Sequence, residues 1–145
     1  MLNIESLKQF KEAQYARHLV FKSDNVEIIM VCWRPGQGSP VHDHGPSDGL
    51  MVILEGEITN TSYFPDGKKV TTVWAKGDVG HTPVGVRHEV RNNSKSDVVS
   101  FHIYAPPLAR ELQGADLGYD NIVTVCEAPL PGEVVRYLMG ANHKS

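Results

Sequence analysis

The sequence predicts an all-β fold, either a two-sheet sandwich or a small closed barrel, for a chain of 145 residues. Short runs rich in β-branched and aromatic residues recur about nine times along the chain. Turn-forming Gly, Pro, Asn and Asp residues separate these runs, and helical periodicity is almost absent. A closed barrel would leave no sheet edge exposed and would give inward-facing polar side chains one interior in which to meet.

Composition limits the number of domains and the classes of partner. With 41% hydrophobic and 21% charged residues, the chain is expected to form one globular domain over residues 1–145. A net charge of −3 without a basic run argues against nucleic acid as a partner. No apolar run reaches the roughly 18 residues of a membrane span, so no membrane partner is expected.

The N-terminus and the cysteines indicate the compartment. Glu5 and Lys8 lie where a signal peptide would have an apolar run, so we expect a cytoplasmic protein. Cys32 and Cys126 are the only cysteines in the sequence. Two cysteines are too few for a disulfide framework, and they are interpreted as small buried hydrophobic residues.

The first part of the chain is expected to form a short helix and two strands. A capping-box spacing predicts a helix over residues 7–13, within a helical lead-in over residues 1–13. A strand is predicted over 15–21, where Tyr15, Arg17, Leu19 and Phe21 alternate with Ala16, His18 and Val20. The run over 26–33 has few polar residues, which predicts a buried strand.

The later elements follow from the same signals. We expect a hairpin turn at Pro65-Asp66-Gly67. The predicted barrel covers residues 14–126 and is followed by a tail over 127–145. Further strands are expected over 49–54, 57–64, 69–74, 86–90, 97–104 and 122–125. A loop or loose helix is expected over 108–119, and a terminal helix over 133–139.

Two histidines lie at the centre of the segment from Trp33 to Gly56. Successive side chains of an extended strand point to opposite faces, so His42 and His44 would share one face and Asp43 would lie on the other. Two imidazoles on one face are suitable ligands for a transition metal. Two surface histidines are the alternative at this point.

Two later strands place further polar side chains beside apolar ones. His88 shares an apolar face with Val86 and Val90, where it is either a buried core histidine or a third ligand. On the strand over 97–104, one face carries three polar side chains, whereas the other is apolar. These polar residues are Ser100, His102 and Tyr104.

Both histidine segments resemble the two sequence signatures of the cupin superfamily. The first signature matches at Gly36, His42, His44 and Gly56, but Gly49 occupies the slot that holds glutamate in most cupins. The second signature is complete, with Gly77, Pro83, Gly85, His88 and Asn92. The resemblance implies a cupin double-stranded β-helix, a small jelly-roll barrel with a few short flanking helices, in which His42, His44 and His88 bind one metal.

In lacking this glutamate, the chain resembles the cysteine dioxygenase branch of that superfamily, whose members bind iron through three histidines. The resemblance covers about residues 14–107 and includes the segments 15–20, 32–44 and 100–107. Animal members carry a cysteine at the slot of Gly49, cross-linked to the tyrosine that matches Tyr104. Gly49 has no side chain that could form this link, and in this respect the chain resembles the bacterial members. The family has a cis peptide bond before the proline that matches Pro106, where Ala105 replaces the serine of the animal enzymes.

The resemblance implies an iron-dependent thiol dioxygenase that oxidises L-cysteine to cysteine sulfinic acid with O2. Fe(II) would be the cofactor, and Ni or Zn could occupy the site after purification. Three neutral imidazoles leave the metal its full charge, which favours an anionic thiolate ligand. They also leave about three positions open, for the thiolate and amine of the substrate and for dioxygen.

The resemblance also implies roles for the other site residues. Arg17 would bind the substrate carboxylate with its planar guanidinium, and Tyr15 would support the pocket beside it. Tyr104 would orient the substrate or oxygen, while His102 and Ser100 would hold the phenol in place. A small thiol and O2 would be the partners of a monomer or small homo-oligomer.

Several alternatives stay open. Family members that prefer 3-mercaptopropionate carry glutamine at the position of Arg17, so a different small thiol acid is one alternative substrate. A metal-binding cupin without catalysis is another. Asp48 could act as a fourth ligand, although strand alternation directs it outward. His18, His81 and His143 have no motif support and are expected on the surface.

Overall fold

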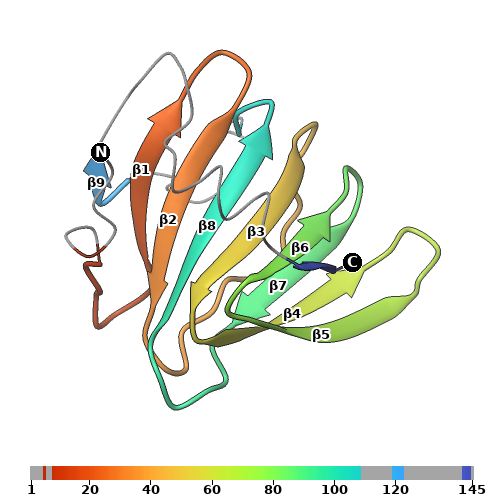
Figure 1. Ribbon diagram of the computed structural model, residues 1–145. Helices are drawn as coiled ribbons and strands as arrows, with labels where there is room; N and C mark the ends of the chain where they lie inside the picture. The colour runs from red at the N-terminus through yellow and green to blue at the C-terminus, as the bar shows by residue number, and fades with distance from the viewer. Residues whose placement is uncertain (1–4, 6–7, 109–118, 123–141, 145) are drawn as a thin grey trace.

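The computed structural model describes residues 5, 8–108, 119–122 and 142–144, which form ten strands in two sheets. The large sheet has the order β10-β6-β3-β8-β2-β1-β9, and the small sheet has the order β5-β4-β7 (Figure 1). The strands are β1 (Ala16–Lys22), β2 (Glu27–Trp33), β3 (Asp48–Glu55), β4 (Glu57–Tyr63), β5 (Lys69–Ala75), β6 (Asp78–Thr82), β7 (Arg87–Arg91), β8 (Val98–Ala105), β9 (Asn121–Ile122) and β10 (Asn142–Lys144). Strands β9 and β10 join the large sheet in parallel, whereas its other neighbours are antiparallel.

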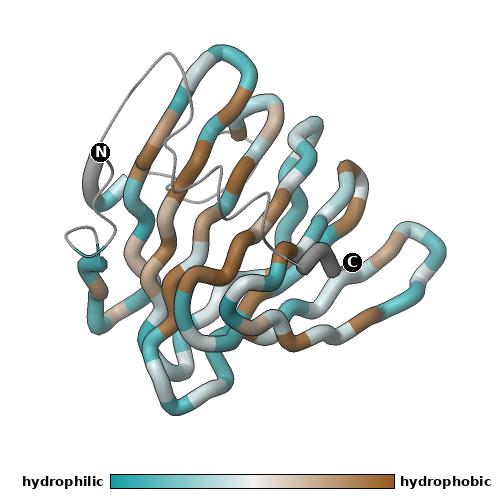
Figure 2. The backbone as a smooth tube through the Cα atoms, in the orientation of Figure 1, coloured by the Kyte–Doolittle hydropathy of each residue, from teal (hydrophilic) through white to brown (hydrophobic). Residues whose placement is uncertain are grey.

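The large sheet buries residues on both of its faces. Its outer face carries one apolar cluster, which includes Val20, Ile28, Met30, Val52 and Phe101. Its inner face forms a second cluster with the small sheet. This cluster includes Ile29 and Ile53 of the large sheet and Ile58, Trp74 and Val90 of the small sheet. Figure 2 shows the apolar residues along the strands and hydrophilic residues at many of the connecting turns. The space between the two sheets is therefore the interior that a functional site can use.

The alternation predicted for the first strand is present, but it changes at a bulge. The pairing of β1 with β2 shifts register between Leu19 and Phe21, so Phe21 joins the outer cluster together with Val20. The prediction that His18 lies on the surface is wrong, because only 1% of His18 is exposed. Its Nε2 atom lies 2.9 Å from the carbonyl oxygen of Gln9, so the buried imidazole is hydrogen-bonded to the N-terminal segment.

The helix predicted for residues 7–13 is wrong where the structure describes it, since residues 8–13 are not helical. Backbone carbonyls of this segment accept hydrogen bonds from side chains of the barrel. Gln37 Nε2 donates to the carbonyl oxygens of Lys11 and Glu12 at 2.7 and 3.3 Å. Phe10 packs against the outer cluster. These contacts hold the segment against the barrel and replace the hydrogen bonds that a helix would make within itself.

The remaining predicted elements have mixed outcomes. Apart from Glu5, no residue that the structure describes is helical, so the flanking helices expected from the resemblance are not seen there. The helix predicted for 133–139 and nearly all of the loop predicted for 108–119 lie outside the described residues. The strand predicted for 122–125 is described only at its start, as β9. No described helix has the length and hydropathy that a membrane crossing would need.

Two short antiparallel bridges bring the two histidine segments together. Gly38 pairs with Arg91, and His42 pairs with His88. The backbone N–H of His42 donates to the carbonyl of His88 at 2.9 Å, and the N–H of His88 donates back at 2.8 Å. Gly85 lies in the turn before β7 with φ at +86°, a conformation that favours glycine. The topology therefore fixes two candidate ligands opposite each other at the level of the backbone.

Candidate metal centre

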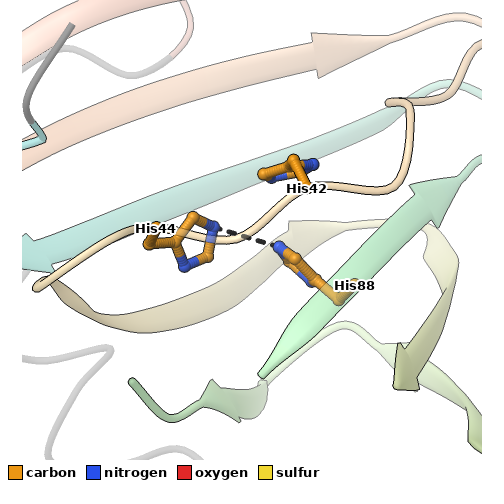
Figure 3. Close-up of side chains that lie close together, drawn as sticks. All are labelled: His42, His44 and His88. Atoms are coloured by element: carbon orange, nitrogen blue, oxygen red, sulfur yellow. Dashed lines mark hydrogen bonds between the residues drawn. The ribbon is translucent and has the colours of Figure 1, made fainter. Parts of the chain in front are cut away.

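Three histidines converge between the two sheets. His42 and His44 lie on the segment that leads into β3, and His88 lies on β7 (Figure 3). One ring nitrogen from each lies within 4.8 Å of the others, and among the described residues this is the one such group of His, Cys, Asp or Glu. His44 and His88 are buried, with 5% and 3% exposure. The three residues predicted as metal ligands are thus brought together.

Hydrogen bonds on the outer side of the rings direct the remaining nitrogens toward the cluster. The Nδ1 atom of His42 lies 2.7 Å from the carbonyl oxygen of Pro40, and Nδ1 of His88 lies 2.8 Å from Oδ1 of Asn60. Both partners are acceptors, so each Nδ1 carries the proton and each Nε2 presents a lone pair. Asn60 Nδ2 donates to Ser62 Oγ at 2.9 Å, which fixes the orientation of the amide.

The arrangement of the donors fits a first-row metal ion. The Nε2 atoms of His44 and His88 are 3.1 Å apart. Imidazole nitrogens bind such ions at about 2.1 Å, so two ligands at right angles would lie about 3.0 Å apart. The Nδ1 atom of His44 is buried and has no hydrogen-bond partner among the described residues. The three rings can therefore offer neutral nitrogen ligands from one side of a cation.

Burial keeps these imidazoles neutral. Burial, together with a smaller effect of the neighbouring His42, lowers the pKa of His44 to about 4 and the pKa of His88 to about 2. Burial also lowers the pKa of His42. Neutral imidazole is the form that binds a metal, so the site does not have to release protons at neutral pH before binding one.

The slot of the absent glutamate lies beside this cluster. A Cβ atom on Gly49 would come within 2.9 Å of Nδ1 of His44 and within 3.5 Å of Cε1 of Tyr104. Asp48, the alternative fourth ligand, instead lies 2.7 Å from Nε2 of His81 and is not part of the histidine group. His81 and Asp48 are both partly exposed. Within the part of the chain that the structure describes, the cluster thus consists of three histidines and no acid.

A cavity of about 430 Å³ opens beside the histidines. Arg17 and Tyr15 line it, as do Trp33 and Tyr104. The Nη1 atom of Arg17 is buried and has no hydrogen-bond partner among the described residues. The ring of Tyr15 packs on Trp33, with centroids 4.6 Å apart. The cavity therefore combines a possible metal site with a buried, unpaired cationic donor, and its volume suits a small organic ligand.

A line of hydrogen bonds on the inner faces of β2 and β8 ends at the cavity. The indole N–H of Trp33 donates to Ser100 Oγ at 3.0 Å, and this oxygen lies 2.8 Å from Nε2 of His102. Nδ1 of His102 lies 3.4 Å from the hydroxyl oxygen of Tyr104. Trp33 can only donate, so Ser100 can direct its own proton to Nε2 of His102. The neutral ring of His102 then carries its proton on Nδ1, toward Tyr104.

Burial sets the protonation of this line. It lowers the pKa of His102 to about 3, with a further contribution from the nearby His44, so the imidazole is neutral at physiological pH. Burial also raises the pKa of Tyr104, so the phenol keeps its proton. If Nδ1 of His102 donates to the phenol oxygen, the proton of Tyr104 remains available to a ligand in the cavity.

The sequence reasoning assigned no role to two residues of this site, Trp33 and Asn60. Trp33 supplies the donor at the start of the hydrogen-bond line. Asn60 orients His88. Strand alternation gave a signal for Asn60, because it shares the buried face of β4 with Ile58 and Ser62. The contact of Asn60 with His88 cannot be predicted without knowing that β4 pairs with β7.

Comparison with protein families gives a match over most of the chain. A family model described as cysteine dioxygenase type I matches residues 3–112. Cysteine dioxygenase type 1 of Danio rerio is 29% identical over 111 residues, and that of Homo sapiens is 30% identical over 110 residues. These alignments cover 68% of this chain and 55% and 54% of the two proteins. The chain therefore spans about half the length of these curated relatives.

Solved structures agree on the fold. The crystal structure of TT1209 from Thermus thermophilus has a TM-score of 0.66 and 27% identity, covering 73% of this chain and 96% of that protein. The cupin domain of Cnp3 from Schizosaccharomyces pombe has a TM-score of 0.59 and 22% identity, covering 66% of this chain and 67% of that chain. The predicted all-β cupin fold is confirmed. The Ala105–Pro106 bond is cis, as the resemblance implied.

Proposed function

Because this chain belongs to the cysteine dioxygenase type I family, we propose that it is a thiol dioxygenase that uses Fe(II) held by His42, His44 and His88. The proposed reaction adds both atoms of O2 to the sulfur of L-cysteine and gives cysteine sulfinic acid, so no further reductant is needed. One observation carries the proposal: His42 and His88 of the neutral three-histidine cluster line the same cavity as Arg17, whose buried Nη1 donor has no hydrogen-bond partner among the described residues.

The cluster suits a metal that must bind an anionic ligand. When bound, Fe(II) would favour the thiolate form of the substrate and supply the redox chemistry with O2. The three imidazoles are neutral, and Gly49 contributes no carboxylate, so no ligand candidate among the described residues cancels the metal's charge. They also leave ligand positions open on the side of the cavity.

Arg17 is the proposed binding group for the substrate carboxylate. Its Nη1 donor is buried and has no partner among the described residues, which costs free energy unless a ligand pairs with it. A carboxylate accepts two parallel hydrogen bonds from a guanidinium, which would fix both the position and the orientation of the substrate. Tyr15 packs against Trp33 and would support this wall of the cavity.

Tyr104 is the proposed group that contacts the reacting atoms. Its ring packs edge-on against His44, with centroids 4.9 Å apart, so the phenol lies beside the ligand cluster. His102 and Ser100 would hold the phenol through the hydrogen bonds that begin at Trp33. A protonated phenol in this position could donate to a ligand in the cavity throughout the physiological pH range.

The test is turnover under defined metal loading. Protein loaded with Fe(II) without oxygen, then mixed with L-cysteine and O2, should consume the two in equal amounts and form the sulfinate. Metal-free protein and a His88→Ala variant are the controls, and both should lack turnover. Binding of iron and cysteine without oxygen consumption would contradict the proposal and favour a metal-binding cupin without catalysis.

The second candidate, oxidation of 3-mercaptopropionate or a related thiol acid, uses the same site. The presence of Arg17 supports L-cysteine, since the resemblance associates glutamine at this position with 3-mercaptopropionate. We expect Arg17→Gln to lower kcat/KM for L-cysteine by about tenfold or more, through loss of a charge-assisted bidentate contact. A wild-type protein with higher kcat/KM for 3-mercaptopropionate than for L-cysteine would reverse the substrate assignment.

A further inference from the structure

Glu27 is a buried carboxylate that the proposed reaction does not use. It lies at the start of β2 with 2% exposure, on the inner face that also carries Val31 and Trp33. One of its oxygens accepts the backbone N–H of Leu108 at 2.9 Å. Its other oxygen accepts the hydroxyl of Tyr119. A buried carboxylate needs such donors, and here both come from residues between β8 and β9.

Tyr119 connects this carboxylate to the proposed substrate-binding arginine. Cζ of Arg17 lies 5.8 Å from the centre of the Tyr119 ring, within the range of a cation–π contact. Tyr119 also lines the cavity, as does Arg17. The ring is therefore tied at its hydroxyl by Glu27, while it contacts the guanidinium at the wall of the cavity.

The next residue, Asp120, holds the backbone of Arg17. The N–H of Asp120 donates to the carbonyl of Arg17 at 2.7 Å, and the N–H of Arg17 donates to Oδ2 of Asp120 at 2.8 Å. The other carboxylate oxygen of Asp120 forms an ion pair with Lys11 at 2.7 Å. The pair Tyr119–Asp120 therefore contacts Arg17 at both its backbone and its side chain.

These contacts matter because Nη1 of Arg17 has no hydrogen-bond partner among the described residues. A long side chain with free donors loses entropy when it is held in one orientation, and a ligand that has to order it binds more weakly. A ring that already restricts the guanidinium reduces this cost. The effect would be specific to ligands that carry a carboxylate, because other ligands do not use the guanidinium.

We propose that Glu27 and Tyr119 are positioning residues that orient Arg17 and thereby set the preference of the site for carboxylate-bearing thiols. This inference rests on the proposed function, because it assumes that Arg17 binds the substrate. Glu27 acts indirectly, by holding the hydroxyl of Tyr119, whose ring contacts Arg17. A carboxylate suits this place because it accepts from both Leu108 and Tyr119, whereas a carboxamide has only one oxygen acceptor.

Paired binding titrations of Fe(II)-loaded protein without oxygen test the proposal. L-cysteine and 2-aminoethanethiol carry the same thiol and amine, but only the first has a carboxylate. The quantity measured is the ratio of their dissociation constants, which reports the contribution of the carboxylate. We expect Tyr119→Phe to weaken L-cysteine binding by about tenfold and to leave 2-aminoethanethiol binding within about twofold of wild type. Glu27→Gln should change the ratio in the same direction.

A matched control is available in Tyr63→Phe. Tyr63 also donates its hydroxyl to a glutamate, Glu89, at 2.9 Å, but this pair joins β4 to β7 and neither residue lines the cavity. The control should leave the ratio unchanged. Turnover should show the same pattern, with a higher KM for L-cysteine and kcat within about twofold in Tyr119→Phe.

The outcomes separate the inference from the proposed function. An unchanged ratio in Tyr119→Phe, or equal weakening of both thiols, would overturn the positioning role. Glu27 is buried, so Glu27→Gln can fail to fold; Tyr119→Phe removes a single oxygen from a half-buried ring and decides the question alone. Wild-type protein that binds L-cysteine but consumes no oxygen would overturn the proposed function and leave the binding ratio interpretable.

Discussion

Gly49 lies so close to His44 that a Cβ atom at position 49 would come within 2.9 Å of the imidazole Nδ1. Real Cβ atoms essentially never approach another heavy atom so closely. The glycine therefore does more than omit a carboxylate ligand. It also leaves the space in which the His44 ring adopts its orientation toward His42 and His88.

We expect Gly49→Ala to weaken metal binding. The added methyl group would displace the His44 ring from its present orientation toward the other two, and overpacking of this kind typically costs about 1–3 kcal/mol. The dissociation constant for Zn(II) or Fe(II), measured by competition with a chelator, should rise about tenfold, which corresponds to about 1.4 kcal/mol. Unchanged metal affinity would show that His44 can move without cost.

Asp48→Asn should leave metal binding unchanged. The Asp48 carboxylate lies 2.7 Å from His81 and is not part of the histidine cluster. The same competition assay should give a dissociation constant for the metal within about twofold of wild type, since an exposed ion pair such as Asp48–His81 contributes little to the stability of the fold. A loss of metal affinity as large as that expected for Gly49→Ala would mean that Asp48 binds the ion.

Asn60→Ala should weaken metal binding without removing a ligand. Oδ1 of Asn60 lies 2.8 Å from Nδ1 of His88 and thereby fixes its tautomer and ring orientation. Loss of such a partner typically costs about 10- to 100-fold in metal affinity. Asn93→Ala, in an exposed turn, is the matched control and should behave as wild type. Equal metal affinity of both variants would assign the orientation of His88 to the backbone alone.

Sequence alternation was informative where strands are regular. The strand with His88 between Val86 and Val90 has the predicted buried and exposed faces, because side chains alternate strictly there. The first strand differs, because a bulge between Leu19 and Phe21 changes the face of the residues beyond it. The lack of a motif around His18 predicts a surface position, and the sequence does not reveal that the N-terminal segment covers this side chain.

Contacts between distant segments were beyond prediction from one sequence. Glu27 and Tyr119 are separated by 92 positions, and neither belongs to a motif. Asn60 and His88 belong to different strands, and only the pairing of β4 with β7 brings them together. The three metal-ligand candidates could be predicted because two motifs with fixed spacing contain them. The supporting residues have no fixed spacing and depend on the packing of the whole barrel.

Ser100→Ala should lower kcat more than it raises KM. Ser100 connects the indole of Trp33 to His102, and His102 contacts the hydroxyl of Tyr104. Without the serine, Nε2 of His102 loses its 2.8 Å partner and the tautomer is no longer fixed. We expect kcat for L-cysteine to fall about tenfold, with KM within a few-fold of wild type. Ser96→Ala, in an exposed turn, is the control. A change in KM alone would place Ser100 in substrate binding.

The metal-free protein should lose stability as the pH falls below about 6.5. Burial lowers the pKa of His44 to about 4, that of His102 to about 3 and that of His88 to about 2, from 6.5. Below pH 6.5 the unfolded chain therefore binds protons that the folded chain cannot, so the free energy of unfolding decreases. The free energy of unfolding reaches its full value above pH 6.5. Below that pH, each histidine decreases it with a slope that approaches about 1.4 kcal/mol per pH unit, until the histidine is protonated in the folded state as well.

Urea unfolding at about pH 7.5, 6 and 5, with a chelator present, measures this dependence. His102→Gln removes one buried imidazole that is not a candidate metal ligand, so its stability should fall less steeply with decreasing pH than that of wild type. A free energy of unfolding that is constant between pH 7.5 and 5 would mean that these imidazoles are accessible to protons in the folded state. Such accessibility would contradict the closed, neutral cluster on which the proposed metal site depends.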